Sequence, residues 1–208
     1  MKVVVIPVTA YQQNCSLVWC PETLKGALID PGGDLPKLLN AIEKKQVQIE
    51  KILLTHAPID HAGAAADAAK TLQVPIVGPH RNEQMLIDML EFQSQMSGIP
   101  AKAFTPDQWL EEGDRIRVGN LVFDVLFCPG HTAGHVVFHA PQNNIVFVGD
   151  VLFYGSIGRT DLPGGDTATL LASIKNKLFT LADSTVVVSG HGPNTTLGHE
   201  KRNNPFLR

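Results

Sequence analysis

The first part of the chain is dominated by short hydrophobic, β-branched runs, and Gly or Pro closes each of them. The runs are "KVVVIPV" (2–8), "CSLVW" (15–19) and "GALIDPGG" (26–33). This pattern predicts short strands joined by turns. Residues 34–46 then place apolar side chains at helical spacing behind Asp34. The spacing predicts an amphipathic helix with that aspartate as its N-cap.

The alternation of strand-like and helix-like segments continues to the end of the chain. A strand, a helix and a strand are expected at 50–56, 61–72 and 74–79. Three strands, a helix and a last strand follow at 121–128, 134–140, 143–150, 167–181 and 184–192. Two strand-rich halves with helices between them predict two sheets face to face and helices on the outer faces.

The segment between the halves, residues 81–109, is expected to contain a helix and an irregular stretch. Apolar side chains are spaced along it at Met85, Leu86, Met89 and Met96. Methionine fills irregular gaps in cores, so packing in the core is the expectation, with the lining of a groove as the alternative.

Length and composition limit the classes of protein that fit. The chain has 208 residues, 44% of them hydrophobic and 18% charged, which favours one compact domain over residues 1–208. The formal net charge is −3 with scattered basic residues, so no nucleic-acid partner is expected. No apolar run approaches the ~18 residues that cross a membrane, and no signal peptide is recognisable. A cytoplasmic monomer or small homo-oligomer with three reduced cysteines is expected.

Histidine or aspartate follows most of the expected strands. These residues are Asp30, His56, Asp60, His61, His131, Asp150 and His191. A single histidine at a strand end is usually structural. Several strand ends with imidazole or carboxylate groups indicate a metal site, because these are the ligands that zinc and similar ions accept.

Four segments carry a resemblance to a known family. "THAPIDH" (55–61), "CPGHTAGH" (128–135), "FVGD" (147–150) and "SGHG" (189–192) occur in this order over nearly the whole chain. Together they resemble the metallo-β-lactamase superfamily, whose signature is HxHxDH followed by single His, Asp and His ligands. The resemblance implies an α/β fold, an αββα sandwich of two mixed β-sheets with the site at one edge.

The resemblance also implies a ligand set by position. His56 and His131 would belong to a first metal, Asp60, His61 and His191 to a second, and Asp150 would bridge them. Asp60 and Asp150 are the candidate catalytic residues, and Asp30 and His135 are expected to orient the ligands from behind. The expected cofactor is zinc, as one or two ions, with iron or manganese as alternatives.

One ligand position of the signature falls on Pro58. In an extended loop residues 56 and 58 project to the same side, so a histidine at each would hold one ion. Proline has no lone pair to offer, although it suits the position before a helix. The second site is therefore expected to be complete, and the first to lack a ligand.

Two further segments narrow the resemblance within the superfamily. "DVLFYGSIGRTDLPGGD" (150–166) and "GHGPNTTLGHEKRNNPFL" (190–207) look like those of the compact type II glyoxalases, the hydroxyacylglutathione hydrolases. The resemblance implies attack of a metal-bound hydroxide on S-lactoylglutathione, giving D-lactate and glutathione. Arg159 would pair with a glutathione carboxylate, and Tyr154 would line the same pocket.

The same residues are also compatible with two other functions. His56, His131 and Asp150 form the two-histidine, one-carboxylate set of mononuclear iron enzymes, which fits a glutathione persulfide dioxygenase. The loss of a ligand at Pro58 also fits a catalytically weakened binding protein of the same fold.

Overall fold

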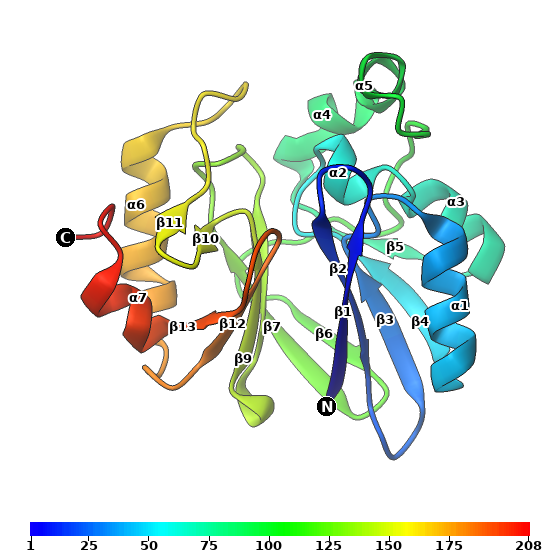
Figure 1. The fold of residues 1–208 in the computed structure, drawn as a ribbon, viewed down its shortest axis with the longest axis horizontal. Coiled ribbons are helices and arrows are strands. Elements are labelled where there is room, and N and C mark those ends of the chain that lie inside the picture. Colours follow the sequence, from blue (N-terminus) through cyan, green and yellow to red (C-terminus); the bar gives the residue numbers. More distant parts are fainter.

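The computed structural model describes all residues, 1–208, as two β-sheets packed face to face with helices outside (Figure 1). The first sheet has the order β1 (Lys2–Val8), β2 (Gln13–Trp19), β3 (Lys25–Ile29), β4 (Gln48–Leu53), β5 (Ile76–Val77). The second has the order β13 (Thr195–Thr196), β12 (Val186–Ser189), β9 (Ile145–Gly149), β8 (Val136–Ala140), β7 (Leu121–Phe127), β6 (Arg115–Val118). A separate hairpin is formed by β10 (Leu152–Phe153) and β11 (Ser156–Ile157).

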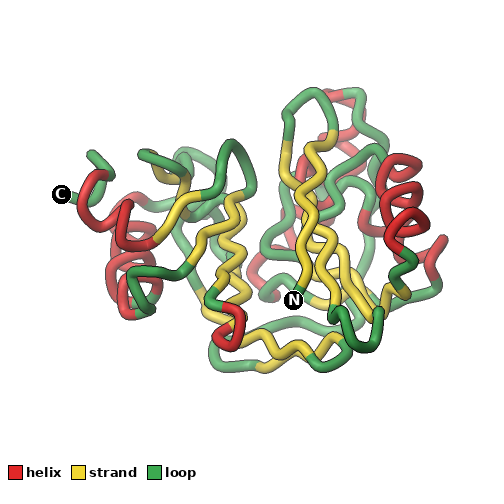
Figure 2. Tube along the Cα trace, turned by 60° about the horizontal axis from the view of Figure 1, so that its bottom comes forward, coloured by secondary structure: helices red, strands yellow, loops and turns green.

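The helices fall into three groups. The outer face of the first sheet is covered by α1 (Leu35–Lys45) and α3 (Ala65–Leu72), and that of the second by α6 (Thr167–Asn176) and α7 (Leu197–Asn203). The upper edge in Figure 1 carries α2 (Ile59–Ala62), α4 (Gln84–Asp88) and α5 (Leu90–Ser97). Short 3₁₀ turns are η1 (Arg81–Glu83), η2 (Pro141–Asn143) and η3 (Leu178–Thr180). Figure 2 shows helices at the two outer sides and the strands between them.

The core is divided into layers by the period-two alternation of the strands. On β4, Leu53 packs between the sheets with Phe138 and Phe147, whereas Ile52 packs with the helices of the first sheet. On β9, Val146 packs on the opposite side from Phe147, with the α6 helix. Both sheets mix parallel and antiparallel pairs. The predicted αββα sandwich is therefore confirmed.

The expected helix over residues 61–72 is wrong as a single element, because the structure breaks it between α2 and α3. Gly63 lies at the break, where an added Cβ would come within 2.6 Å of the Gly32 carbonyl oxygen. The Ala64 amide donates a hydrogen bond to the Pro31 carbonyl at 2.9 Å. The loop after β3 thus docks into the break, and α2 becomes a short separate turn.

Asp34 precedes α1 as predicted, but its side chain does not cap the helix. Its backbone lies in the left-handed region, and the carboxylate accepts a hydrogen bond from the Thr9 amide at 2.8 Å. The aspartate therefore ties the end of β1 to the start of α1.

The methionines of the segment between the halves do not pack in the core. Met85, Met89 and Met96 are 53%, 37% and 75% exposed on α4 and α5. Core packing was therefore the wrong expectation for them. The three cysteines are buried and free, as predicted. None of the helices is both long enough and apolar enough to cross a lipid bilayer.

Candidate metal centre

The loops that follow β4, β7, β9 and β12 meet at one edge of the sandwich, beside the turn between β1 and β2 (Figure 1). They bring together the six residues expected as ligands, His56, Asp60, His61, His131, Asp150 and His191. These residues are far apart in the sequence: His191 Nε2 lies 3.1 Å from Asp60 Oδ2, although 131 positions separate the two residues.

Within this cluster the potential ligand atoms form two groups whose members all lie within 4.8 Å of one another. One group contains Asp60, His61, Asp150 and His191, and the other contains His56, His131 and Asp150. Asp150 belongs to both, with Oδ1 at 3.2 Å from His61 Nε2 and Oδ2 at 3.7 Å from His131 Nε2.

Several polar atoms of the cluster are buried without a hydrogen-bond partner outside it. The Nε2 atoms of His56 and His131 have none, and the His61 Nε2 and Asp150 Oδ1 atoms have only each other, at 3.2 Å. Burying such groups unpaired costs free energy, so their convergence on one point fits a bound ligand. Imidazole nitrogens beside a carboxylate fit a divalent transition-metal ion.

Asp30 and Thr55 orient two of these imidazoles. The Asp30 carboxylate accepts hydrogen bonds from the Thr55 hydroxyl at 2.6 Å and from His61 Nδ1 at 3.0 Å. Because the Thr55 hydroxyl gives its proton to Asp30, it accepts one from His56 Nδ1 at 2.9 Å. His56 therefore carries its proton on Nδ1 and turns its Nε2 lone pair inward, and the bond from His61 Nδ1 to Asp30 leaves His61 Nε2 as the ring atom that faces the cluster.

Hydrogen bonds also orient His131 and Asp150. His131 Nδ1 donates to the Arg159 carbonyl oxygen at 2.7 Å, which leaves its Nε2 lone pair free. His135 Nε2 accepts the Asp150 amide proton at 3.1 Å. Asp30 and His135, expected to orient ligands, thus both contact the cluster directly.

Burial and neighbouring charges set the protonation of the cluster. Burial lowers the pKa of His56 well below its ordinary value, so this imidazole is neutral. Burial alone would raise the pKa of the Asp150 carboxyl, but His61 and the other imidazoles hold it well below its usual range. Burial alone would lower the pKa of His61, but the carboxylates of Asp150 and Asp60 raise this pKa well above its ordinary value. The site combines ionised carboxylates with imidazoles, which suits a cation.

Pro58 lies at the rim of the cluster and contributes no ligand atom. Its backbone is extended, with φ −56° and ψ 152°, and its carbonyl accepts the amide protons of His61 and Ala62. The proline thus begins α2. His80 packs on Phe127 with ring centroids 4.6 Å apart and belongs to neither group of potential ligands.

A pocket of about 300 Å³ opens over the cluster. It is lined by Tyr11, Pro58, Ile59, Asp60, His131, Asp150, Arg159, Leu162 and His191. Arg159 lies at the wall of this pocket. Its exposed guanidinium already pairs with Asp161 through two hydrogen bonds of 2.6 Å.

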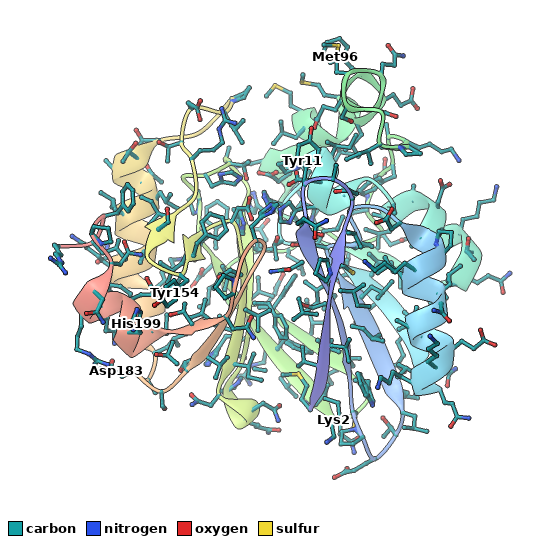
Figure 3. The ribbon with its side chains drawn as sticks, in the orientation of Figure 1. Lys2, Tyr11, Met96, Tyr154, Asp183 and His199 are labelled. Atoms are coloured by element: carbon teal, nitrogen blue, oxygen red, sulfur yellow. The ribbon has the colours of Figure 1, made fainter.

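Tyr154 does not line this pocket, which corrects the sequence-based expectation. It lies on the turn between β10 and β11, is 55% exposed, and stacks on His199 with ring centroids 5.0 Å apart (Figure 3). Gly155, with φ +66°, turns the chain here and directs the tyrosine ring towards α7.

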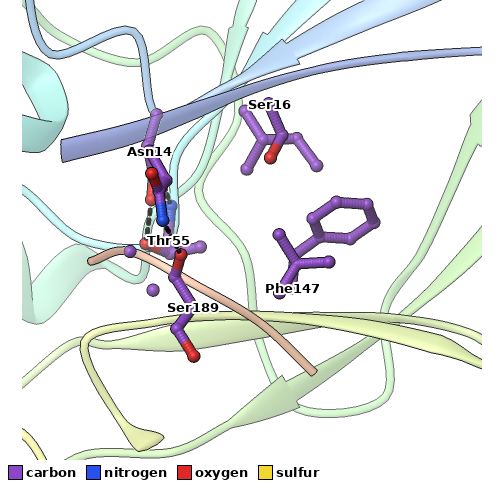
Figure 4. Close-up of a pocket in the computed structure, with 10 residues that line it drawn as sticks. Asn14, Ser16, Thr55, Phe147 and Ser189 are labelled. Atoms are coloured by element: carbon purple, nitrogen blue, oxygen red, sulfur yellow. Dashed lines mark hydrogen bonds between the residues drawn. The ribbon is translucent and has the colours of Figure 1, made fainter. Parts of the chain in front are cut away.

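A second cavity, of about 10 Å³, lies behind the cluster between the two sheets (Figure 4). Its polar lining includes Asn14, Ser16, Asp30, Thr55 and Ser189. Its volume corresponds to about one water molecule, so it is too small for a substrate.

Sequence reasoning missed one residue that connects the ligand loops. Glu83 in η1 is fully buried, and its carboxylate accepts hydrogen bonds from the Ala57 amide at 3.0 Å and the Gly134 amide at 2.6 Å. Ala57 lies between His56 and Pro58, and Gly134 precedes His135. Burial raises the pKa of Glu83. Both hydrogen bonds come from backbone amides, so no pattern of side chains in the sequence predicts the role of Glu83.

Comparison with known proteins places this geometry in a family. Residues 8–191 match the family described as the metallo-beta-lactamase superfamily. The chain belongs to this superfamily. A relative from Haemophilus influenzae, the hydroxyacylglutathione hydrolase GloC, is 44% identical over 209 residues, which cover 100% of this chain and 98% of the relative.

Solved structures of other superfamily members match over nearly the whole length. The BLEG-1 B3 metallo-beta-lactamase has a TM-score of 0.91 and 38% identity and covers 99% of both chains. TTHA1623, solved in a di-iron-bound form, has a TM-score of 0.90 and 41% identity, over 99% of this chain and 100% of that one. Proteins of this superfamily with similar folds thus carry different names, and one of them has been solved with two iron ions bound.

Proposed function

We propose that this protein is a metal-dependent hydrolase of glutathione thioesters, with S-lactoylglutathione as substrate and D-lactate and glutathione as products. One observation carries the proposal: inward Nε2 atoms lie beside a shared carboxylate at the base of an open pocket. The similarity to GloC over the full chain supports the glutathione thioester as the substrate.

The residues that would hold the metal are the two groups that share Asp150. Asp60, His61, His191 and Asp150 supply four ligands, whereas His56, His131 and Asp150 supply three. A bound divalent cation supplies positive charge that polarises a carbonyl and makes a water molecule more acidic. Zinc suits this ligand set, and the di-iron form of TTHA1623 supports iron as the alternative.

The remaining residues would bind and orient the thioester. In the 300 Å³ pocket the substrate would lie against Asp60, Asp150 and His191, and Arg159 on its wall would pair with a glutathione carboxylate. A thiol with a pKa of about 8.5 leaves as thiolate without a strong acid beside it. The absence of a further acidic group from the pocket lining is therefore compatible with thioester cleavage.

A second candidate reaction is supported by the smaller group. His56, His131 and Asp150 are the ligand set of a mononuclear iron enzyme, and their ligand atoms lie within 4.8 Å of one another. Glutathione persulfide dioxygenation at one iron is the corresponding activity.

The test loads the protein separately with zinc, iron and manganese and determines metal per chain by plasma emission. Release of glutathione from S-lactoylglutathione is followed with a thiol reagent, and oxygen uptake with glutathione persulfide is followed in parallel. Thiol release that is lost in His61→Ala and kept in His199→Ala, a histidine outside the cluster, supports the hydrolase. Oxygen uptake without thioester cleavage would establish the dioxygenase instead. If the protein catalyses neither reaction, the binding protein is the remaining candidate.

A further inference from the structure

Besides the 10 Å³ cavity between the sheets, a hollow of about 230 Å³ adjoins the pocket over the candidate metal centre. It is lined by Tyr11, Ile59, Gln93, Met96 and Ser97. Tyr11 and Ile59 also line the first pocket, so the two hollows share a wall. We name the hollow that these five residues define the α5 groove. Figure 3 shows Tyr11 on the turn between β1 and β2 and Met96 on α5, at the same edge of the molecule.

Large apolar side chains are concentrated around the α5 groove. Of the eight exposed large hydrophobic residues of the chain, five lie on the β1–β2 turn or on α4 and α5: Tyr11, Met85, Met89, Phe92 and Met96. Within the groove itself, Tyr11 is 53% and Met96 75% exposed. Exposed apolar side chains gathered beside a site favour a binding surface there.

The groove is preformed, because hydrogen bonds fix α5 to α2. The Gln93 side chain accepts the Ile59 amide proton at 3.1 Å and donates to the Leu86 carbonyl at 3.4 Å. The Ser97 hydroxyl donates to the Gln93 carbonyl at 2.8 Å. Ile59 directly precedes Asp60, so the wall of the groove continues into the cluster.

Charge distinguishes the two ends of the combined cavity. Arg159 and Leu162 line only the first pocket, whereas Gln93 and Met96 line only the α5 groove. Arg159 is the one arginine or lysine among all the lining residues. In Figure 1 the loop after β11, which carries Arg159, and helix α5 rise on different sides of the β1–β2 turn.

A thioester has two arms that diverge from its carbonyl carbon. The glutathione arm is charged and suits the end with Arg159, so the acyl arm is directed towards Tyr11 and Met96. We propose that the α5 groove is the acyl-binding subsite and that the preferred substrates are glutathione thioesters with a large apolar acyl group. This inference rests on the proposed thioester hydrolysis.

The first experiment compares kcat/KM for S-lactoylglutathione and for S-mandeloylglutathione, in which a phenyl ring replaces the lactoyl methyl group. The wild-type protein should favour the mandeloyl thioester. Met96→Gln and Tyr11→Ser should each lower the mandeloyl-to-lactoyl ratio about three- to tenfold, because apolar contact area is lost. Leu24→Gln is the control: it changes an exposed apolar side chain in the turn between β2 and β3, outside the groove, and should leave the ratio unchanged.

The second experiment measures binding without turnover. Calorimetry with S-methyl-, S-butyl- and S-hexylglutathione should show affinity rising about two- to fourfold per added methylene in the wild type. The rise should flatten in Met96→Gln. A binding series that is flat in the wild type, or a ratio that neither groove substitution changes, would overturn the subsite. Loss of all thioester turnover with an intact binding series would instead refute the proposed function and leave an apolar subsite.

Discussion

The Glu83 carboxylate accepts a hydrogen bond from the Gly134 amide at 2.6 Å, although 51 positions separate the two residues. Its other oxygen accepts the Ala57 amide proton. One fully buried side chain therefore joins the loop that carries His56 to the loop that carries His131. An added Cβ at Gly134 would lie 2.7 Å from the Glu83 side chain, so the glycine permits this close contact.

Glu83→Gln should weaken metal binding about 10- to 100-fold, the usual effect of removing a partner that orients ligands. The amide offers one acceptor atom where two amide protons must be bound, so one loop loses its anchor. Competition with a chromophoric chelator measures the affinity. Glu200→Gln is the matched control, since Glu200 is equally buried but accepts from Gly155 and Thr195. Equal losses of affinity in both variants would show a general effect on folding.

Asp161→Asn should lower KM for glutathione thioesters, because the Arg159 guanidinium is now held by the Asp161 carboxylate. Arg159→Ala should raise KM on the order of tenfold with a smaller change in kcat, since a remote carboxylate is bound alike in ground and transition states. Steady-state kinetics of both variants measures the effects. Asp183→Asn, which removes a carboxylate paired with Lys201, is the control for loss of one negative charge. If Asp161→Asn leaves KM unchanged, the substrate does not compete with Asp161 for the Arg159 guanidinium.

Removal of metal by a chelator should lower the melting temperature. A ligand at a hundred times its dissociation constant stabilises the folded state by about 2.7 kcal/mol, which corresponds to roughly 5–10 °C for a chain of this size. Differential scanning calorimetry before and after dialysis against a chelator measures the shift, and re-addition of zinc should restore it. The shift should be much smaller in Asp150→Asn, because Asp150 belongs to both ligand groups. A melting temperature insensitive to chelator would contradict a metal site.

The layers of the fold and the position of the cluster could be predicted from the sequence because both follow from local patterns. Apolar runs of period two predict the strands, and polar residues at the strand ends meet where the strands end together. What the sequence could not predict depends on the direction of single side chains. Tyr154 stacks on His199 instead of lining the pocket, and Met96 is 75% exposed on α5, although methionine usually packs in cores.

Buried carboxylates that bind backbone amides form a second limit of sequence reasoning. Glu83 and Glu200 are fully buried, yet their positions in the sequence look like those of surface residues. Each accepts backbone amide protons of glycine or alanine, which every residue type except proline provides. Only the fold shows which amides lie near them.

Pro58→His should raise the metal content from about one ion per chain towards two at limiting zinc. Asp60, His61, Asp150 and His191 already offer four ligand atoms, whereas the group of His56 has three. Pro58 lines the pocket two residues after His56, in an extended backbone that histidine adopts without strain. A second cation stabilises more of the charge that develops during thioester cleavage, so kcat/KM should rise as well.

The control for this substitution is Pro58→Ala, which removes the ring and adds no ligand. Both variants should lose about 0.4–1 kcal/mol of stability, because proline restricts the unfolded chain. Only the histidine variant should gain metal, since only it adds a lone pair beside His56 Nε2, which has no partner. Plasma emission and thioester kinetics on the three proteins separate the two effects. Two tight ions in the unaltered protein, or equal metal content in both variants, would mean that position 58 is not a lost ligand and that water completes the site.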